Sequence, residues 1–305
     1  LQTLGTYISS NKTRSPKGVQ MLFICTITVA VLMLGWFLKN GDPAWGRLSV
    51  PGREFPLPEP FTWVYILPPL AVLALTQWGA PVSTSFLVLS SFHPTNIGQL
   101  LNSSLTGYLV AFGVGLIAYG LGMWLLERWV FRRTQEGKEI NRIWFGLQWL
   151  STGFLWSMWL VEDLANIFVF LPRQLEFFPM AICTAVLCVG LCVLVATGGG
   201  PLQAVLRTKT NTSDLRSATV IDFLFGLCLL YKAFLSSFPL STTWVFLGLI
   251  GGREIALRIK EKEFEVVFTN REGGNLGRII GNDLWKAFVG LVVSLGVALG
   301  IQTLI

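Results

Sequence analysis

Two short stretches of this sequence place three hydroxyl residues shortly after a proline in apolar surroundings: PVSTSF at 81–86 and PLSTTW at 239–244. Proline suits the first turn of a helix, and serine or threonine there can cap the free backbone amides. A helix beginning at each motif would present N–H donors, a positive dipole end and hydroxyl groups at one point. This combination predicts an oxyanion site without net charge. The alternative is that each motif only caps a helix or bonds back to a carbonyl.

A pair of adjacent carboxylates is the second polar feature. Glu162 and Asp163 lie between apolar runs in WSMWLVEDLANIFVF. Each costs about 2.5–3.5 kcal/mol to insert into hydrocarbon, so both should face a bundle interior or a water-filled cavity. Asp163 and Asn166 would share a helix face, with oxygen ligands for Na⁺ or a carboxylate that carries a proton. The alternative places the acids at an interface, beside Arg173 or the basic loop 128–142.

The composition indicates the elements that must position these residues. The 305 residues are 52% hydrophobic and 13% charged, with a mean hydropathy of +0.61, which is typical of an all-α integral membrane protein. Segments 81–93 and 239–252 are apolar but only about 13 residues long, which favours re-entrant half-helices over crossings. Seven apolar runs are long enough to cross the bilayer: 20–38, 61–79, 105–127, 143–160, 177–198, 216–234 and 282–304.

The two hydroxyl motifs belong to an internal repeat, because they lie 158 residues apart and other matches share that offset. Ile24-Cys25-Thr26 matches Ile182-Cys183-Thr184, for example. Such duplication is common in secondary transporters, which bind substrate where discontinuous helices meet. We therefore divide the chain in three: a first transmembrane repeat at 1–127, a basic linker at 128–142, and a second repeat at 143–305 with a charged insertion near 253–280.

Other residue types exclude several classes of function. The net charge of +6 lies in loops, where lipid headgroups explain it better than nucleic acid. The five cysteines and the single His93 form no metal-ligand spacing and no nucleophile–base pair, so we expect neither an enzyme nor a cofactor. Asp222 and Lys232 are expected at span edges, with their charges reaching headgroups. The chain starts at Leu1 without methionine, and we expect that the natural N-terminus lies further upstream.

These motifs resemble the inorganic phosphate transporter family of the PiT type. That family carries a duplicated pair, a GANDVANA-like segment followed by a PVSTTH-like segment. WLVEDLANIF at 159–168 is similar to the first element, and PLSTTW follows it at 239–244. In the first half, PVSTSF matches the second element, while LQTLGT at 1–6 is similar to the tail of the first, with Gln2 in the place of Asn166.

The resemblance implies a Na⁺- or H⁺-coupled symporter of inorganic phosphate, built from two inverted repeats with re-entrant helical hairpins and broken helices. Phosphate would bind between the two hairpin tips. The implied substrate-binding residues are Ser83, Thr84, Ser85, Ser241, Thr242 and Thr243. The implied coupling-ion residues are Gln2, Glu162, Asp163 and Asn166, with Na⁺ held at Asp163 and Asn166.

The chain also departs from the family pattern. The histidine that follows the family's hydroxyl triplet is replaced by Phe86 in one copy and by Trp244 in the other, and Glu162 adds negative charge beside an anion site. Transport of another oxyanion such as sulfate, or a structural or accessory role without transport, therefore stays open. We expect a multi-pass protein of the plasma or inner membrane whose partners are the oxyanion and the bilayer, with a homo-oligomer left open.

Overall fold

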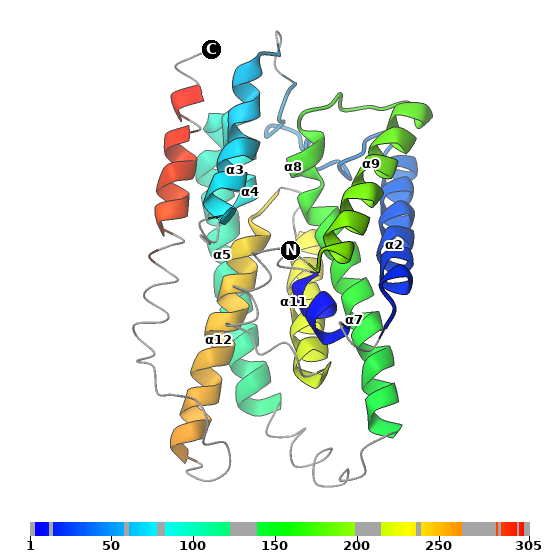
Figure 1. Cartoon of the computed structure of the whole chain (residues 1–305). Helices are drawn as coiled ribbons and strands as arrows, with labels where there is room; N and C mark the ends of the chain where they lie inside the picture. The colour runs from blue at the N-terminus through cyan, green and yellow to red at the C-terminus, as the bar shows by residue number, and fades with distance from the viewer. Residues whose placement is uncertain are drawn as a thin grey trace.

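Helices make up every regular element that the computed structural model describes (Figure 1). It describes residues 4–11, 15–57, 61–77, 83–122, 139–198, 215–235, 239–263, 285, 288–297 and 299–301. The named elements are α1 (Gly5–Asn11), α2 (Lys17–Leu38), η1 (Trp63–Ile66), α3 (Leu67–Gln77), α4 (Thr84–Phe92), η2 (Pro94–Asn96), α5 (Ile97–Ile117), η3 (Ala118–Gly122), α7 (Glu139–Asp163), α8 (Ala165–Phe168), α9 (Phe177–Ala196), α11 (Leu215–Leu235) and α12 (Thr242–Glu263). The all-helical prediction is therefore confirmed for these residues.

Three helical segments are long and apolar enough to cross a membrane: Lys17–Leu38, Pro94–Gly122 and Phe177–Ala196. Only 22%, 22% and 17% of the most apolar window in each is buried within the molecule, so their outward faces are themselves apolar. Phe37 on α2 and Phe178 on α9, for example, are 74% and 72% exposed. Apolar faces of this kind fit a hydrocarbon environment and indicate association with a membrane.

The helix boundaries follow the 158-residue offset of the sequence repeat. The ends of α2 and α9, the ends of α3 and α11, and the starts of α4 and α12 each lie 158 residues apart. Helices α2 and α9 pack side by side and run in opposite directions. Lys17 at the start of α2 donates to the carbonyl of Ala196 at the end of α9 (2.6 Å). Trp36 near the end of α2 donates to the carbonyl of Leu175, which precedes α9 (2.8 Å).

The two predicted half-helices differ in length. Helix α4 has nine residues, about 14 Å, or half the thickness of a bilayer core, and it packs against α3. Helix α12 has 22 residues, so the short arm predicted at 239–252 is wrong in length. In the first copy Pro94 follows the end of α4, and a proline inside a helix removes a hydrogen bond and clashes with the preceding turn. The position 158 residues later is Gly252, which lets α12 continue.

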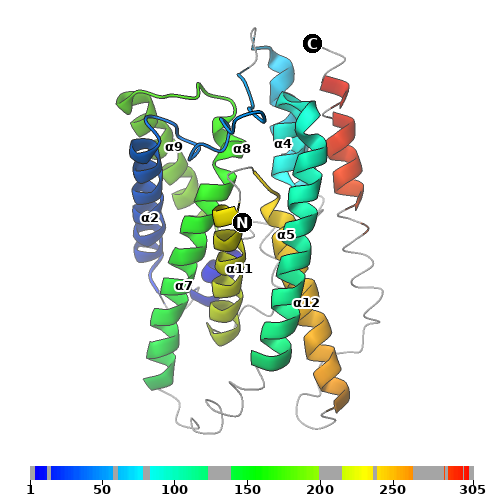
Figure 2. The same ribbon diagram turned by 180° about the vertical axis from the view of Figure 1, so that it is seen from behind.

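Glycines bring α5 and α12 into close contact (Figure 2). A Cβ atom on Gly115 of α5 would meet the carbonyl of Leu249, and one on Gly248 of α12 would meet the carbonyl of Tyr108. Small residues at such positions let two helix backbones approach each other. The sequence left open whether the glycine-rich stretch at 113–122 packs within one chain or between subunits, and the Gly115 contact lies within the chain.

Substituting one of these contact glycines should therefore loosen the helix pair. We expect Gly248→Ala to destabilise the protein by about 1–3 kcal/mol, because its new methyl group overlaps the Tyr108 carbonyl. Gly113→Ala on α5 is the matched control, since no atom lies within 4 Å of its Cβ position. Thermal unfolding in detergent measures both. Equal melting temperatures for the two variants would contradict the close packing of α5 on α12.

Candidate functional site

The first serine of each hydroxyl motif caps a helix. Ser83 Oγ accepts from the backbone N–H of Phe86 (3.1 Å) at the start of α4. Ser241 Oγ accepts from the backbone N–H of Trp244 (3.4 Å) at the start of α12. The predicted helix starts are thus confirmed at both motifs. Capping explains Ser83 and Ser241, and it leaves the other hydroxyl groups of each motif for other partners.

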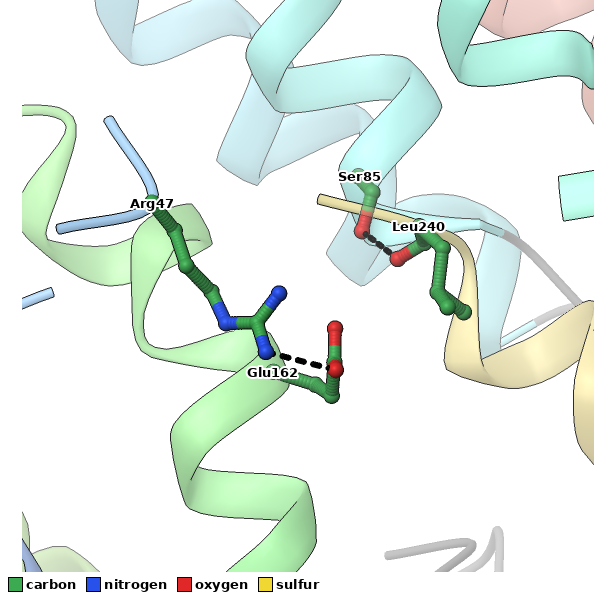
Figure 3. A network of polar contacts seen from close by, with 4 residues as sticks. All are labelled: Arg47, Ser85, Glu162 and Leu240. Carbon is green, nitrogen blue, oxygen red and sulfur yellow. Dashed lines mark hydrogen bonds and ion pairs between the residues drawn. The ribbon is translucent and has the colours of Figure 1, made fainter. Parts of the chain in front are cut away.

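The starts of α4 and α12 meet inside the molecule, and a hydrogen-bonded network connects them to the end of α7. Ser85 Oγ donates to the carbonyl of Leu240 (2.9 Å), just ahead of α12 (Figure 3). Thr242 Oγ1 donates to Asp163 Oδ2 (2.7 Å). Asn166 Nδ2 lies 3.2 Å from both Asp163 Oδ1 and Ser85 Oγ, and it donates to them. Residues from both hydroxyl motifs and from the WLVEDLAN segment therefore converge on one buried cluster.

A break in the helix places the carboxylate and the amide of this cluster. Helix α7 ends at Asp163, Leu164 forms a turn, and α8 begins at Ala165. The hydrogen bond between Asp163 and Asn166 joins the two side chains across this break. Both residues are buried, with 5% and 7% exposure, as the predicted interior position requires.

Glu162 makes a buried ion pair that the sequence analysis did not anticipate. Arg47 Nη2 lies 2.6 Å from Glu162 Oε1, and the two side chains are 3% and 0% exposed (Figure 3). The alternative that placed the acids beside Arg173 is wrong, because the Arg173 guanidinium donates instead to backbone carbonyls, including those of Phe55 and Val169. The 115 residues between Arg47 and Glu162 explain why no local pattern revealed the pair.

A compact loop after α2 positions Arg47. Gly41 and Gly46 adopt φ values of 92° and 76°, which glycine accommodates without a steric penalty. Asp42 Oδ1 accepts from the backbone N–H of Ala44 (2.7 Å) within the same loop. Burial raises the pKa of Asp42 above its usual value, and the hydrogen bonds from backbone N–H groups only partly oppose this effect. The loop is therefore folded against the protein and presents Arg47 inward.

The other predicted site residues are placed as follows. Thr84, the first residue of α4, is half-buried, and Thr243, the second residue of α12, is 5% exposed. Gln2 lies outside the described residues. The predicted set thus divides into two capping serines, four residues joined by hydrogen bonds, one glutamate paired with Arg47, and two threonines beside the helix starts.

Two buried oxygen atoms of this cluster have unused hydrogen-bonding capacity. Glu162 Oε2 and Asn166 Oδ1 have no hydrogen-bond partner among the residues that the structure describes. Buried polar atoms normally find a partner, and exceptions call for an explanation such as an ion or a ligand. Within the described ranges no three His, Cys, Asp or Glu side chains form a group that could hold a metal ion. The oxygen atoms suit a proton or an alkali cation better than a transition metal.

A second buried network corrects the expectation for Asp222. This residue is 1% exposed and accepts hydrogen bonds from Gln148 Nε2 (2.9 Å) and Thr152 Oγ1 (2.7 Å). Thr219 Oγ1 donates to Gln148 Oε1 (3.0 Å). Asp222 thus connects α11 to α7 in the interior and does not reach headgroups. Its partners lie about 70 residues away along the chain, so its burial had no local signal.

Comparisons with protein-family models, characterised proteins and solved structures found no match for this chain. The resemblance to the phosphate transporters therefore depends on the sequence motifs alone.

The bond from Thr242 to Asp163 should contribute measurably to stability. We expect Thr242→Val to destabilise the protein by about 1–3 kcal/mol, since it keeps the side-chain shape and removes a donor to a buried carboxylate. Thr106→Val on α5 is the control, because the exposed Thr106 hydroxyl donates to the Asn102 carbonyl of its own helix. Chemical or thermal unfolding in detergent compares them. A Thr242→Val protein as stable as Thr106→Val would show that this bond contributes little.

Proposed function

We propose that this protein is a secondary transporter that carries inorganic phosphate across a membrane by symport with Na⁺ or H⁺. The observation that carries the proposal is the meeting of two hydroxyl-bearing helix starts, from equivalent positions of a repeat, at one buried carboxylate. Secondary transporters bind substrate at such meeting points of discontinuous helices. Multi-pass insertion belongs to the same proposal.

Several contacts support an inverted relation between the two repeats. The equivalent helices α2 and α9 run in opposite directions. The equivalent helices α4 and α12 begin close together and extend away from each other (Figures 1 and 2). Phe86 and Trp244 occupy the same repeat position, and their ring centroids lie 5.9 Å apart. Contact between equivalent residues would be expected next to a pseudo-two-fold axis that passed between the two helix starts.

The cluster offers suitable chemistry for an oxyanion. Phosphate oxygens accept hydrogen bonds, and the starts of α4 and α12 supply backbone N–H groups with a positive dipole end. Ser85 and Thr242 add hydroxyl donors, which now bond to Leu240 and Asp163. Phosphate would replace those acceptors, so binding requires a rearrangement of the cluster but no new donor. The aromatic Phe86 and Trp244 would close the site where the resembled family has histidine.

Cation coupling follows from the charge of Asp163. Its carboxylate accepts hydrogen bonds from Thr242 and Asn166 but makes no ion pair with any residue in the described part of the chain. An anion brought next to an uncompensated carboxylate meets like-charge repulsion in a medium of low dielectric constant. A Na⁺ ion or a proton on Asp163 removes that repulsion. Substrate and cation would therefore bind together, which is the requirement for symport.

Uptake of radiolabelled phosphate into proteoliposomes tests the proposal, with the full natural chain and with an imposed Na⁺ or H⁺ gradient. Wild-type protein should take up phosphate under at least one gradient. Asp163→Asn should reduce gradient-driven uptake about tenfold or more, because the amide keeps the shape and cannot carry the charge. Thr242→Val should also reduce uptake about tenfold, through loss of a donor to the anion.

Asp222→Asn is the matched control, since it makes the same substitution at an equally buried carboxylate that connects α7 and α11. It should retain uptake when corrected for the amount of folded protein. Wild type that takes up neither phosphate nor sulfate under either gradient would contradict transport. Equal uptake by wild type, Asp163→Asn and Thr242→Val would contradict the site and leave transport intact.

A further inference from the structure

The ion pair between Arg47 and Glu162 lies beside the proposed oxyanion site. Glu162 immediately precedes Asp163, whose carboxylate bonds to Thr242 at the start of α12. Figure 3 shows the Arg47 guanidinium and the Glu162 carboxylate extending toward the side where Ser85 bonds to Leu240. Arg47 also acts electrostatically on Asp163, which bonds to Thr242, so the pair lies near the cluster that would bind phosphate. Arg47 is a cation that the sequence motifs did not include.

Because Arg47 and Glu162 are buried, each charge needs the other as its compensating partner. Both side chains are at most 3% exposed. Separating a buried ion pair leaves each ion without compensation and is strongly unfavourable unless a replacement partner is present. Among the described residues, no donor bonds to the second carboxylate oxygen, Glu162 Oε2. The carboxylate therefore has no other hydrogen bond there that would compensate the loss of Arg47.

Arginine is well suited to leave a carboxylate for an oxyanion. Its planar guanidinium presents paired N–H donors that match both carboxylate and phosphate oxygens, and its charge persists at all physiological pH values. Phosphate placed at the starts of α4 and α12 would compete with Glu162 for Arg47. The ion pair thus holds Arg47 in place when the site is empty and presents it when an anion enters.

We propose that phosphate displaces Glu162 from Arg47 and that Glu162 then binds a proton, so that each phosphate bound brings one proton into the site. This inference rests on the proposed transport function, and it adds a proton at Glu162 to the Na⁺ ion or proton that neutralises Asp163. The proton comes from the water on the side where phosphate enters and forms an O–H bond on the freed carboxylate. When phosphate leaves, Arg47 returns to Glu162 and the proton is released to water. No bond to phosphorus is made or broken.

Other charged groups near Glu162 affect how readily it binds a proton. Asp163, a second carboxylate, lies next to it on the same helix, and the two groups interact electrostatically. Lys232 on α11 and Arg47 act on Glu162 as positive charges and oppose protonation. Arg53 lies near Lys232 in the same region. Lys232 is half-buried and makes no bond to the free Oε2 atom, so a move of Lys232 toward Glu162 is the competing way to compensate the freed carboxylate.

Calorimetry separates these possibilities without requiring transport. Inorganic phosphate is titrated into the purified full-length protein at one pH in two buffers of different ionisation enthalpy, which gives the number of protons bound per phosphate. Wild type should bind about one proton more than Glu162→Gln, while the variant still binds phosphate. Comparison with the variant removes the contribution of phosphate's own titration. In wild type the phosphate affinity should also fall more steeply as the pH rises.

Arginine variants test the other half of the exchange. Arg47→Gln should weaken phosphate binding about tenfold or more, and Arg47→Lys, which keeps the charge and the buried pairing, should restore part of it. Glu254→Gln is the control, since it makes the same change in the separate Arg253–Glu254 pair and should leave affinity and proton uptake unchanged.

The outcomes distinguish the two proposals. If wild type and Glu162→Gln bind phosphate with the same proton uptake, the exchange is overturned, whether Lys232 or another group compensates Glu162, and phosphate transport still stands. If wild type binds no phosphate, the transport proposal fails and this inference fails with it.

Discussion

The hydrogen bond from Thr242 to Asp163 is the contact on which the interior of this protein depends. A helix start buried away from water leaves backbone N–H groups that need caps, and a buried carboxylate needs donors. At the start of α12 both needs are satisfied. Ser241 caps the helix, and Thr242 and Asn166 donate hydrogen bonds to the Asp163 carboxylate. Neither the helix start nor the acid would be stable in an apolar interior alone, so the polar cluster forms as a unit.

Helix packing fixes the distance between the two hydroxyl motifs. Helix α4 turns through η2 into α5, and α5 packs along α12 through contacts in which glycine backbones touch the facing carbonyls. The start of α12 therefore keeps a constant position relative to the start of α4. Since Ser85 belongs to α4 and bonds to the segment ahead of α12, this packing holds the hydroxyl groups of both motifs in one place.

Local rules predicted the parts of the site that depend on neighbouring residues. Proline followed by hydroxyl residues marked both helix starts, and the cost of carboxylates in hydrocarbon indicated the burial of Glu162 and Asp163. Contacts between distant segments were not predictable in this way. The partner of Glu162 lies on a loop in the other half of the chain, and Asp222 finds its partners on α7. The length of α12 depended on Gly252 replacing a proline, a difference between copies that hydropathy does not register.

The charges of the cluster are distributed unequally between the two halves, although the hydroxyl motifs are shared. Arg47 comes from the first half, and the position 158 residues later is Val205. Glu162 and Asp163 come from the second half. The Arg47–Glu162 ion pair joins the two halves, so a change in their relative position would separate two buried charges. In a transporter whose halves move against each other, Arg47 and Glu162 would thus couple that movement to the charge state of the site.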